Sequence, residues 1–305
     1  SRVMTMLSPS ARPSPARFSP LSSEPASYRY SSVTLLPVVL YTVYSAEVAS
    51  VSEEATSEEA ASEEAVLSEA AGVESAAELP QAAQVQKDTP PVPKLDYRYP
   101  TENASPVGPK ARFALNAAAI GTLRRIEDEG RMATAEEQGI LARYVGWGGL
   151  ADAFDGEKTE WAQEYAQLKS LLDESEYMAA RASTLTAFYT PPTVIRAMYS
   201  ALERWGVTGG NILEPSMGVG NFFGMLPDTM QGSRLYGVEL DSITGRIAKK
   251  LYPQADITVA GFETTDRRDF YDLAVGNVPF GQYKVNDKAY NKLGFSIHNY
   301  FFAKA

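Results

Sequence analysis

The feature that most constrains the fold is a regular alternation of short apolar runs and helical segments that begins near residue 186. Short runs of this kind are typical of buried strands, whereas the segments between them have helical periodicity. We expect strands at 211–213, 234–240, 256–260 and 271–275, and helices at 192–205, 218–226, 242–251 and 295–305. This alternation predicts an α/β fold with a parallel, doubly wound, Rossmann-like sheet.

The residues before this region divide into two parts. Residues 1–109 are rich in Ser, Pro and Glu, and residues 51–79 contain nine Glu but no Lys or Arg. Because like charges repel and large apolar residues are scarce there, we expect residues 1–109 to be disordered. Residues 110–185 carry apolar residues at helical spacing, which predicts a helical lead-in to an α/β domain over 186–305.

One apolar run interrupts the disordered region at residues 33–44. A membrane-spanning helix needs roughly 20 apolar residues, so this run is too short to be one. Arginines precede it as in a signal peptide, but no cleavage signature follows. We therefore expect no membrane contact.

The chain has no cysteine and a single histidine, His298. Disulfides, thiolate zinc sites and thiol nucleophiles are therefore excluded, and with them methylation at C5 of a pyrimidine, which uses a cysteine. We predict no metal site. His298 lies on an expected helix, where we interpret it as a partly buried structural residue rather than a general base.

The turn after the first expected strand has the composition of a ligand site. Two glycines, Gly218 and Gly220, allow a ligand to approach the backbone, and Glu214 precedes them. A carboxylate at this place suits a cationic ligand such as S-adenosylmethionine better than a pyrophosphate. A nicotinamide dinucleotide fingerprint is disfavoured, because the third glycine falls one position late, at Gly224.

The second expected strand ends in Gly237-Val238-Glu239-Leu240-Asp241. An acidic residue at the tip of this strand commonly accepts both ribose hydroxyls of an adenosyl group. Glu239 is placed for that role, whereas Asp241 is placed to cap the following helix. Together with the glycine turn, Glu239 indicates an adenosyl cofactor.

The fourth expected strand runs into Asn277-Val278-Pro279-Phe280, which resembles the Asn-Pro-Pro-aromatic motif of amino-methyltransferases. In such a motif, the Asn side-chain oxygen and the next backbone carbonyl accept hydrogen bonds from the target amino group, and the aromatic ring stacks on the extruded base. The resemblance implies that the catalytic residues are Asn277, Val278, Pro279 and Phe280. A plain proline-containing loop is the structural alternative.

Together, the segments over residues 186–281 resemble the gamma-type N6-adenine DNA methyltransferases. Phe188 to Pro192 resembles the cofactor segment of that family, Glu214 to Phe222 its first motif and Glu239 its second, and Asp256 to Glu263 lies where its third motif is expected. The resemblance implies a class I S-adenosylmethionine-dependent fold. It also implies that the cofactor is bound by Tyr189, Thr190, Glu214, Pro215, Ser216, Gly218, Gly220, Phe222, Glu239, Phe262 and Glu263.

The segment Tyr144 to Gly149, taken with the first and fourth motifs, also resembles the large methylase–helicase proteins of bacterial mobile elements and phages. That resemblance implies a cytoplasmic protein that acts on DNA and continues into a helicase-like region. On composition alone, the Gly146–Gly149 turn is a helix connector with a buried tryptophan or a contact surface.

Two departures from the family pattern keep alternatives open. Val278 replaces the first proline of the fourth motif, and Glu263 stands where the third motif usually has an Asp. The alternatives are a degenerate methyltransferase fold that only binds DNA or a partner, and methylation of another amino group such as a protein glutamine. Because four of the family's seven strands are found, we expect a truncated, inactive or poorly stable domain with an exposed sheet edge.

Overall fold

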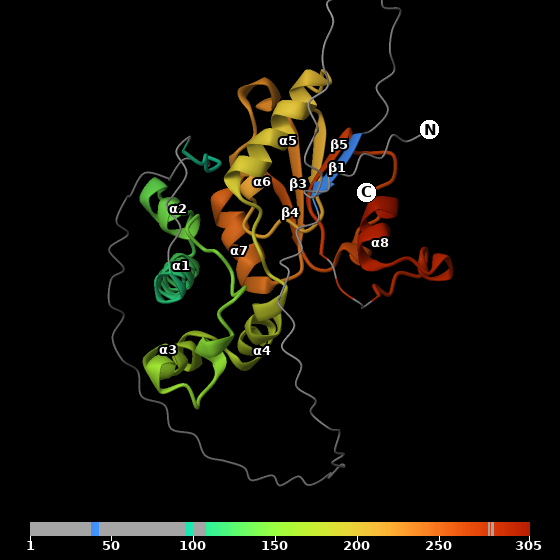
Figure 1. Ribbon diagram of the computed structural model, residues 1–305. Helices are drawn as coiled ribbons and strands as arrows, with labels where there is room; N and C mark the ends of the chain where they lie inside the picture. The colour runs from blue at the N-terminus through green and yellow to red at the C-terminus, as the bar shows by residue number, and fades with distance from the viewer. Residues whose placement is uncertain (1–37, 43–94, 101–107, 280, 282–283) are drawn as a thin grey trace, which may run out of the picture. The chain divides into compact units, whose positions relative to one another are not determined.

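The computed structural model describes residues 38–42, 95–100, 108–279, 281 and 284–305, all within one compact unit. In this part of the chain a five-stranded sheet has the order β1-β5-β2-β3-β4, and all neighbouring strands are parallel. The four strands predicted from the sequence are all present, which confirms the doubly wound α/β fold. The strands are β1 (Val38–Thr42), β2 (Asn211–Glu214), β3 (Arg234–Glu239), β4 (Asp256–Val259) and β5 (Leu273–Asn277) (Figure 1).

Strand β1 corrects two expectations. It lies in the region expected to be disordered, and it pairs with β5 from Val38 opposite Leu273 to Thr42 opposite Asn277. Strand β5 is therefore an interior strand rather than the exposed edge that we expected. Residues 38–42 include two valines and a threonine, which are β-branched and favour strands. No local signal shows that the partner strand, β5, lies more than 200 residues away in the sequence.

Successive apolar side chains of the strands point to opposite faces of the sheet, and helices cover both faces. On one face, Ile212 and Leu273 pack against α5 (Pro192–Arg204). Helix α7 (Ser242–Leu251), capped by the Asp241 carboxylate, covers β3 and β4. On the other face, Leu213 and Ala274 pack against α8 (Ile297–Lys304), so α7 and α8 flank the sheet (Figure 1).

The expected helix at 218–226 is shorter in the structure. Helix α6 spans only Asn221–Gly224, because Gly218 and Gly220 have φ values of 56° and 83°. Such left-handed backbone cannot continue a right-handed helix, so these residues form a loop instead. Short 3-10 helices complete the described structure at Ala151–Phe154, Thr159–Trp161, Ser183–Leu185, Asp228–Met230, Phe262–Thr264 and Asn291–Leu293.

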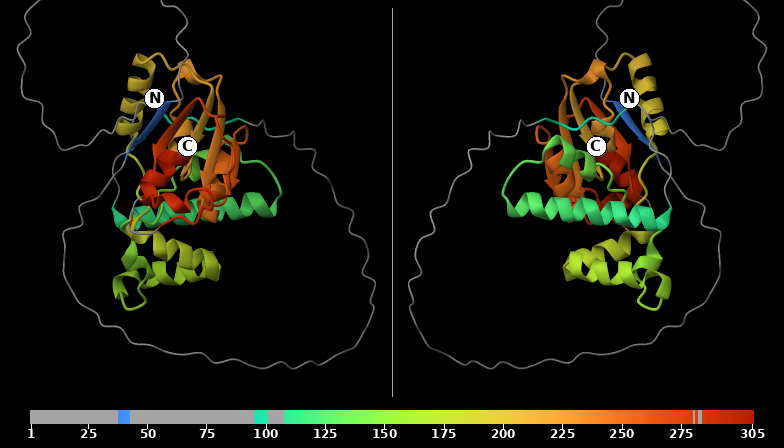
Figure 2. Two further views of the ribbon diagram at one scale, coloured as in Figure 1. Left: turned by 90° about the vertical axis from the view of Figure 1, so that its right-hand side faces the viewer. Right: turned by 90° about the vertical axis from the view of Figure 1, so that its left-hand side faces the viewer.

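The predicted lead-in consists of four helices that share a core with the α/β domain. Helix α1 packs against α7 and α3, and α3 and α4 lie below α1 in the views drawn (Figures 1 and 2). A single apolar cluster joins lead-in residues such as Ile120 to Ile247 on α7 and Ile257 on β4. The sequence boundary at 185 therefore does not separate two cores. The helices are α1 (Pro109–Asp128), α2 (Ala135–Leu141), α3 (Ala162–Leu171) and α4 (Glu174–Ala182).

The segment 95–100 also belongs to this packed structure, although it falls in the region expected to be disordered. The Tyr97 amide donates to the Leu251 carbonyl at 2.8 Å, and the Tyr99 amide donates to the Gly224 carbonyl at 2.9 Å. The Tyr99 hydroxyl donates to Asn221 Oδ1 at 2.7 Å. These bonds attach the segment to α6 and to the end of α7. Among the described residues, no helix is both long and apolar enough to cross a membrane.

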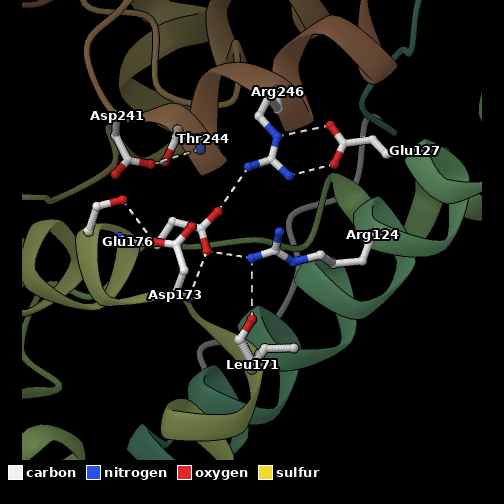
Figure 3. A network of polar contacts seen from close by, with 9 residues as sticks. Arg124, Glu127, Leu171, Asp173, Glu176, Asp241, Thr244 and Arg246 are labelled. Carbon is white, nitrogen blue, oxygen red and sulfur yellow. Dashed lines mark hydrogen bonds and ion pairs between the residues drawn. The ribbon is translucent and has the colours of Figure 1, made fainter. Parts of the chain in front are cut away.

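An ion-pair network fastens the lead-in to α7 (Figure 3). The Arg246 guanidinium donates to both carboxylate oxygens of Glu127 on α1 and, at 2.9 Å, to Glu176 on α4. Arg124 pairs with the same Glu176, whose side chain is only 4% exposed. The Arg246 hydrogen bonds lower the pKa of Glu127. Three helices therefore meet at one shared arginine.

Replacing that arginine is expected to loosen the lead-in. Arg246→Ala leaves the buried Glu176 with one partner fewer, and hydrogen bonds to charged groups contribute roughly 1–3 kcal/mol each. We expect unfolding free energy to fall by that order, measured as a lower midpoint in urea. The control is Arg268→Ala, which removes an exposed pair with Asp266 and should shift the midpoint little. Equal midpoints for the two variants would contradict this role.

Candidate functional site

A cavity of about 690 Å³ opens at the carboxyl ends of the strands. The last residues of three neighbouring strands line it: Glu214 of β2, Glu239 of β3 and Asn277 of β5. In an open parallel sheet, ligands bind at this edge. Glu214 and Asn277 are 63 residues apart in the sequence. The sheet topology thus brings predicted cofactor-binding and catalytic residues to the same cavity.

The loop that follows β2 forms one wall of the cavity. Pro215, Ser216, Gly218 and Phe222, which the resemblance assigns to the cofactor, line this wall. Gly220 does not. A Cβ at Gly220 would lie 2.4 Å from the Tyr252 ring, so this glycine makes room for a buried tyrosine.

Glu239 holds the loop in place and remains available to a ligand. Its Oε2 accepts the Gly218 amide at 2.7 Å, and its Oε1 accepts the Asp241 amide at 2.8 Å. Burial raises the pKa of Glu239 to about 7, partly offset by these amides. Each carboxylate oxygen retains a second lone pair that can accept a ribose hydroxyl.

Glu214 is 2% exposed, and its Oε2 has no hydrogen-bond partner. Burial raises the pKa of Glu214 well above its usual value, and the charge of Glu239 raises it further. A buried carboxylate without a partner is unfavourable, and a cationic group in the cavity would relieve that penalty. This arrangement fits the predicted role of Glu214 toward a positively charged ligand.

Asn277 lines the same cavity and has an unused hydrogen-bond acceptor. Its Nδ2 donates to the Phe188 carbonyl over 3.4 Å, while its Oδ1 is buried and has no partner. Its own backbone carbonyl accepts the Ser216 hydroxyl at 2.7 Å. The side-chain oxygen is therefore the acceptor of Asn277 that has no partner in the fold.

The rest of the predicted catalytic loop is described only in part. Val278 is 1% exposed and packs in the core with Phe301 of α8, while also lining the cavity. Its side chain therefore fixes the loop by packing, where a proline would fix it through its ring. Pro279 lines the cavity as well. Phe280 lies outside the described residues.

The lead-in contributes to the site in a way that sequence analysis missed. The Tyr189 ring fits between two glycines, so a Cβ at Gly146 or at Gly218 would lie within 2.8 Å of it. A Cβ at Gly148 would lie 2.2 Å from the Ala187 carbonyl. Trp147 is buried, which agrees with the connector interpretation. The same turn also positions Tyr189 and the buried Thr190, whose Oγ1 lines the cavity without a partner.

Two more groups of residues line the cavity. Phe262 is 5% exposed and stacks on Phe301, so it offers apolar cover, whereas Glu263 lines the cavity from an exposed position. Helix α4 supplies Ser175, Ala179 and Ala182. No sequence motif marks these α4 residues, and the only local signal is their small size.

The remaining predictions concern groups outside this site. His298 is partly buried, and its Nε2 contacts the Ser296 hydroxyl at 3.1 Å while Nδ1 has no partner. It does not line the cavity. Among the described residues, no cluster of three His, Asp or Glu side chains could hold a metal ion.

The cavity fits the predicted cofactor in charge and polarity. Three of its buried polar atoms lack partners, namely Thr190 Oγ1, Glu214 Oε2 and Asn277 Oδ1. Buried polar atoms without partners are rare in folded proteins, and at a cavity wall they indicate ligand contacts. Glu239 and Phe262 line the same cavity as these atoms.

Comparison with known proteins gives two sequence relatives, and no family model matches the chain. The chain is 28% identical to Defense against restriction protein B of Escherichia phage P1 over 175 residues, 56% of this chain. It is 32% identical to the type II methyltransferase M.CvrRI of Paramecium bursaria Chlorella virus XZ-6E over 93 residues, 30% of this chain. These matches span only 6% and 24% of the relatives' lengths.

Two solved structures are similar at low identity. A class I S-adenosylmethionine-dependent methyltransferase structure from Listeria monocytogenes has 14% identity and a TM-score of 0.32, covering 65% of this chain and 69% of that one. A type I restriction-modification methyltransferase subunit from Streptococcus thermophilus has 15% identity and a TM-score of 0.29, covering 58% and 47%.

The parallel order of β5, β2, β3 and β4 is the Rossmann-like sheet that the motifs predicted, and one of the two sequence relatives is a methyltransferase. S-adenosylmethionine is the cofactor that this resemblance implies.

Cofactor affinity is expected to depend on pH through Glu239. Its pKa of about 7 means that protons compete with the ribose hydroxyls for the carboxylate, so binding weakens as the pH falls through 7. Between pH 8 and pH 6 we expect the dissociation constant to rise about tenfold. Isothermal titration with adenosine isolates this effect, because adenosine has the ribose but no methionine charges.

Glu239→Gln provides the control for that titration. The amide keeps the shape of the side chain but does not ionise in this pH range, so its weaker adenosine affinity should be nearly constant from pH 6 to pH 8. A wild-type affinity that does not change with pH, or a pH dependence that persists in Glu239→Gln, would contradict the assignment.

Proposed function

We propose that this domain transfers a methyl group from S-adenosylmethionine to the N6 amino group of adenine in DNA. The observation that carries the proposal is the buried, unpartnered Oδ1 of Asn277 in the same cavity as Glu214 and Glu239. In this proposal, the cofactor site and the acceptor for an amino group belong to one cavity.

The chemistry assigned to the chain consists of binding and orientation. The Asn277 side-chain oxygen and the Val278 carbonyl accept hydrogen bonds from the two hydrogens of the target amino group. These contacts favour a tetrahedral nitrogen whose lone pair is directed at the methyl donor. When bound, the cofactor would supply the methyl group of its sulfonium; the bond from sulfur to the methyl carbon would break as the new bond to nitrogen forms, and the sulfur would leave as a neutral thioether. After transfer the nitrogen loses a proton to solvent, so no residue needs to act as a strong base.

The proposed target requires an extruded base, because the N6 amino group of a stacked adenine cannot reach the bottom of a cavity. Pro279 lines the cavity, and Phe280 follows it in the chain as the proposed stacking residue. Lys284 and Lys288 are exposed just beyond this loop, where they either contact DNA phosphates or remain solvated.

The proposed setting is a large bacterial or phage protein that acts on DNA in the cytoplasm and includes a helicase-like region. The similarity to a phage P1 protein involved in defence against restriction supports this setting. A degenerate fold that binds DNA without transferring a methyl group is the second candidate. The valine at position 278 favours that alternative, since it replaces the proline of the motif.

The test measures transfer of labelled methyl groups to unmethylated bacterial DNA by the natural protein that contains this sequence. We expect N6-methyladenine in the digested product. Asn277→Ala should lower the rate roughly 10²–10³-fold, the usual effect of removing one preorganised polar group. Asn299→Ala is the matched control, because Asn299 is exposed on α8 and does not line the cavity.

The product identifies which proposal holds. Label in another base or in protein would exclude adenine N6 as the target while keeping the transferase. Binding of cofactor and DNA without any transfer would exclude the enzyme and leave the binding module.

A further inference from the structure

The loop after β2 is connected to the catalytic loop by one side chain. The register pairs between β2 and β5 end at Leu213 and Ala274, before either strand reaches the cavity. Beyond them, the Ser216 hydroxyl donates to the Asn277 carbonyl at 2.7 Å. This bond extends the connection between the two strands to the residue that offers the acceptor.

The loop that carries Ser216 is itself held on its other side. The Met217 amide donates to the Val238 carbonyl at 3.0 Å, and the Gly218 amide donates to the Glu239 carboxylate at 2.7 Å. Ser216 therefore contacts Asn277 from a loop that hydrogen bonds anchor to β3. Its hydroxyl hydrogen is used in this bond, so it is not free to donate to a cofactor.

The Ser216 bond also determines what Asn277 can offer. It occupies the backbone carbonyl of Asn277 and fixes one end of the peptide that leads to Val278, whose buried side chain fixes the other end. The carbonyl of Val278 and the Oδ1 of Asn277 are the two proposed acceptors, and both depend on the orientation of this peptide.

We propose that Ser216 is a positioning residue for methyl transfer rather than a ligand of the cofactor. It sets the orientation of Asn277 and Val278 from the loop that lines the cofactor side of the cavity. This inference rests on the proposed function, because positioning matters only if these acceptors receive a target amino group.

The experiment compares Ser216→Ala with Ser216→Thr, which keeps the hydroxyl. We expect Ser216→Ala to lower the single-turnover rate at saturating cofactor and DNA by about tenfold to a hundredfold, the range typical of small misplacements of reacting groups. Its dissociation constant for S-adenosylmethionine should stay within about twofold of wild type, which also shows that the variant folds. Ser216→Thr should recover most of the rate.

Ser170→Ala is the matched control. Ser170 makes the same kind of bond, from its hydroxyl to the Gln167 carbonyl at 2.8 Å, but it lies on exposed α3 outside the cavity. Its rate and affinity should equal those of wild type.

Three outcomes would overturn the inference. Weaker cofactor binding by Ser216→Ala with an unchanged saturating rate would make Ser216 a cofactor ligand. If Ser216→Ala has the wild-type rate and the wild-type cofactor affinity, Ser216 neither positions the catalytic loop nor binds the cofactor. Absence of transfer by the wild-type protein would remove the proposed function and this inference together, and the wild-type reaction distinguishes that case from the other two.

Discussion

Parallel pairing of β3, β2 and β5 is the constraint on which the site depends. Parallel strands end at one edge of a sheet, so the final residues of these strands, Glu239, Glu214 and Asn277, meet although the chain separates them. The glycine loop after β2 then closes the space between these strand ends, held by Glu239 on one side and by the Asn277 carbonyl on the other. The proposed function places cofactor binding and amine recognition at this same sheet edge.

At this sheet edge, several buried polar atoms lack hydrogen-bond partners, which is unfavourable for the stability of the fold. Glu214, Thr190 and Asn277 each have a buried oxygen without a partner, and burial raises the pKa of both Glu214 and Glu239. Such groups destabilise the empty fold, because they lose hydration without gaining hydrogen bonds. The surrounding core offsets this, and a ligand that carries positive charge and hydrogen-bond donors would satisfy the same atoms.

The helical lead-in supports this edge from outside the sheet. Its core is continuous with that of the α/β domain, and Arg246 ties α7 to α1 and α4 through two carboxylates. Because Gly146 and Gly218 leave room for the Tyr189 ring between them, a turn in the lead-in fixes the segment that presents Thr190. The lead-in is thus part of the binding site, in agreement with the cavity lining supplied by α4.

Local sequence signals predicted four of the five strands and the strand-end residues that line the cavity. Strand and helix periodicity located β2 to β5 and α7, and the residues at the strand ends identified Glu214, Glu239 and Asn277, because these signals are local. Three features could be seen only in the packed structure. Val38–Thr42 joins the sheet, and the missing side chain of Gly220 makes room for the Tyr252 ring instead of lining the cavity. The Ser216 hydroxyl donates a hydrogen bond to the Asn277 carbonyl. Each of these depends on contacts between residues far apart in the chain, which leave no periodic or compositional trace. The periodicity of the sequence indicates which face of a helix or strand a residue occupies. The residue that it contacts in another part of the chain is determined only when the sheet and the helices pack together.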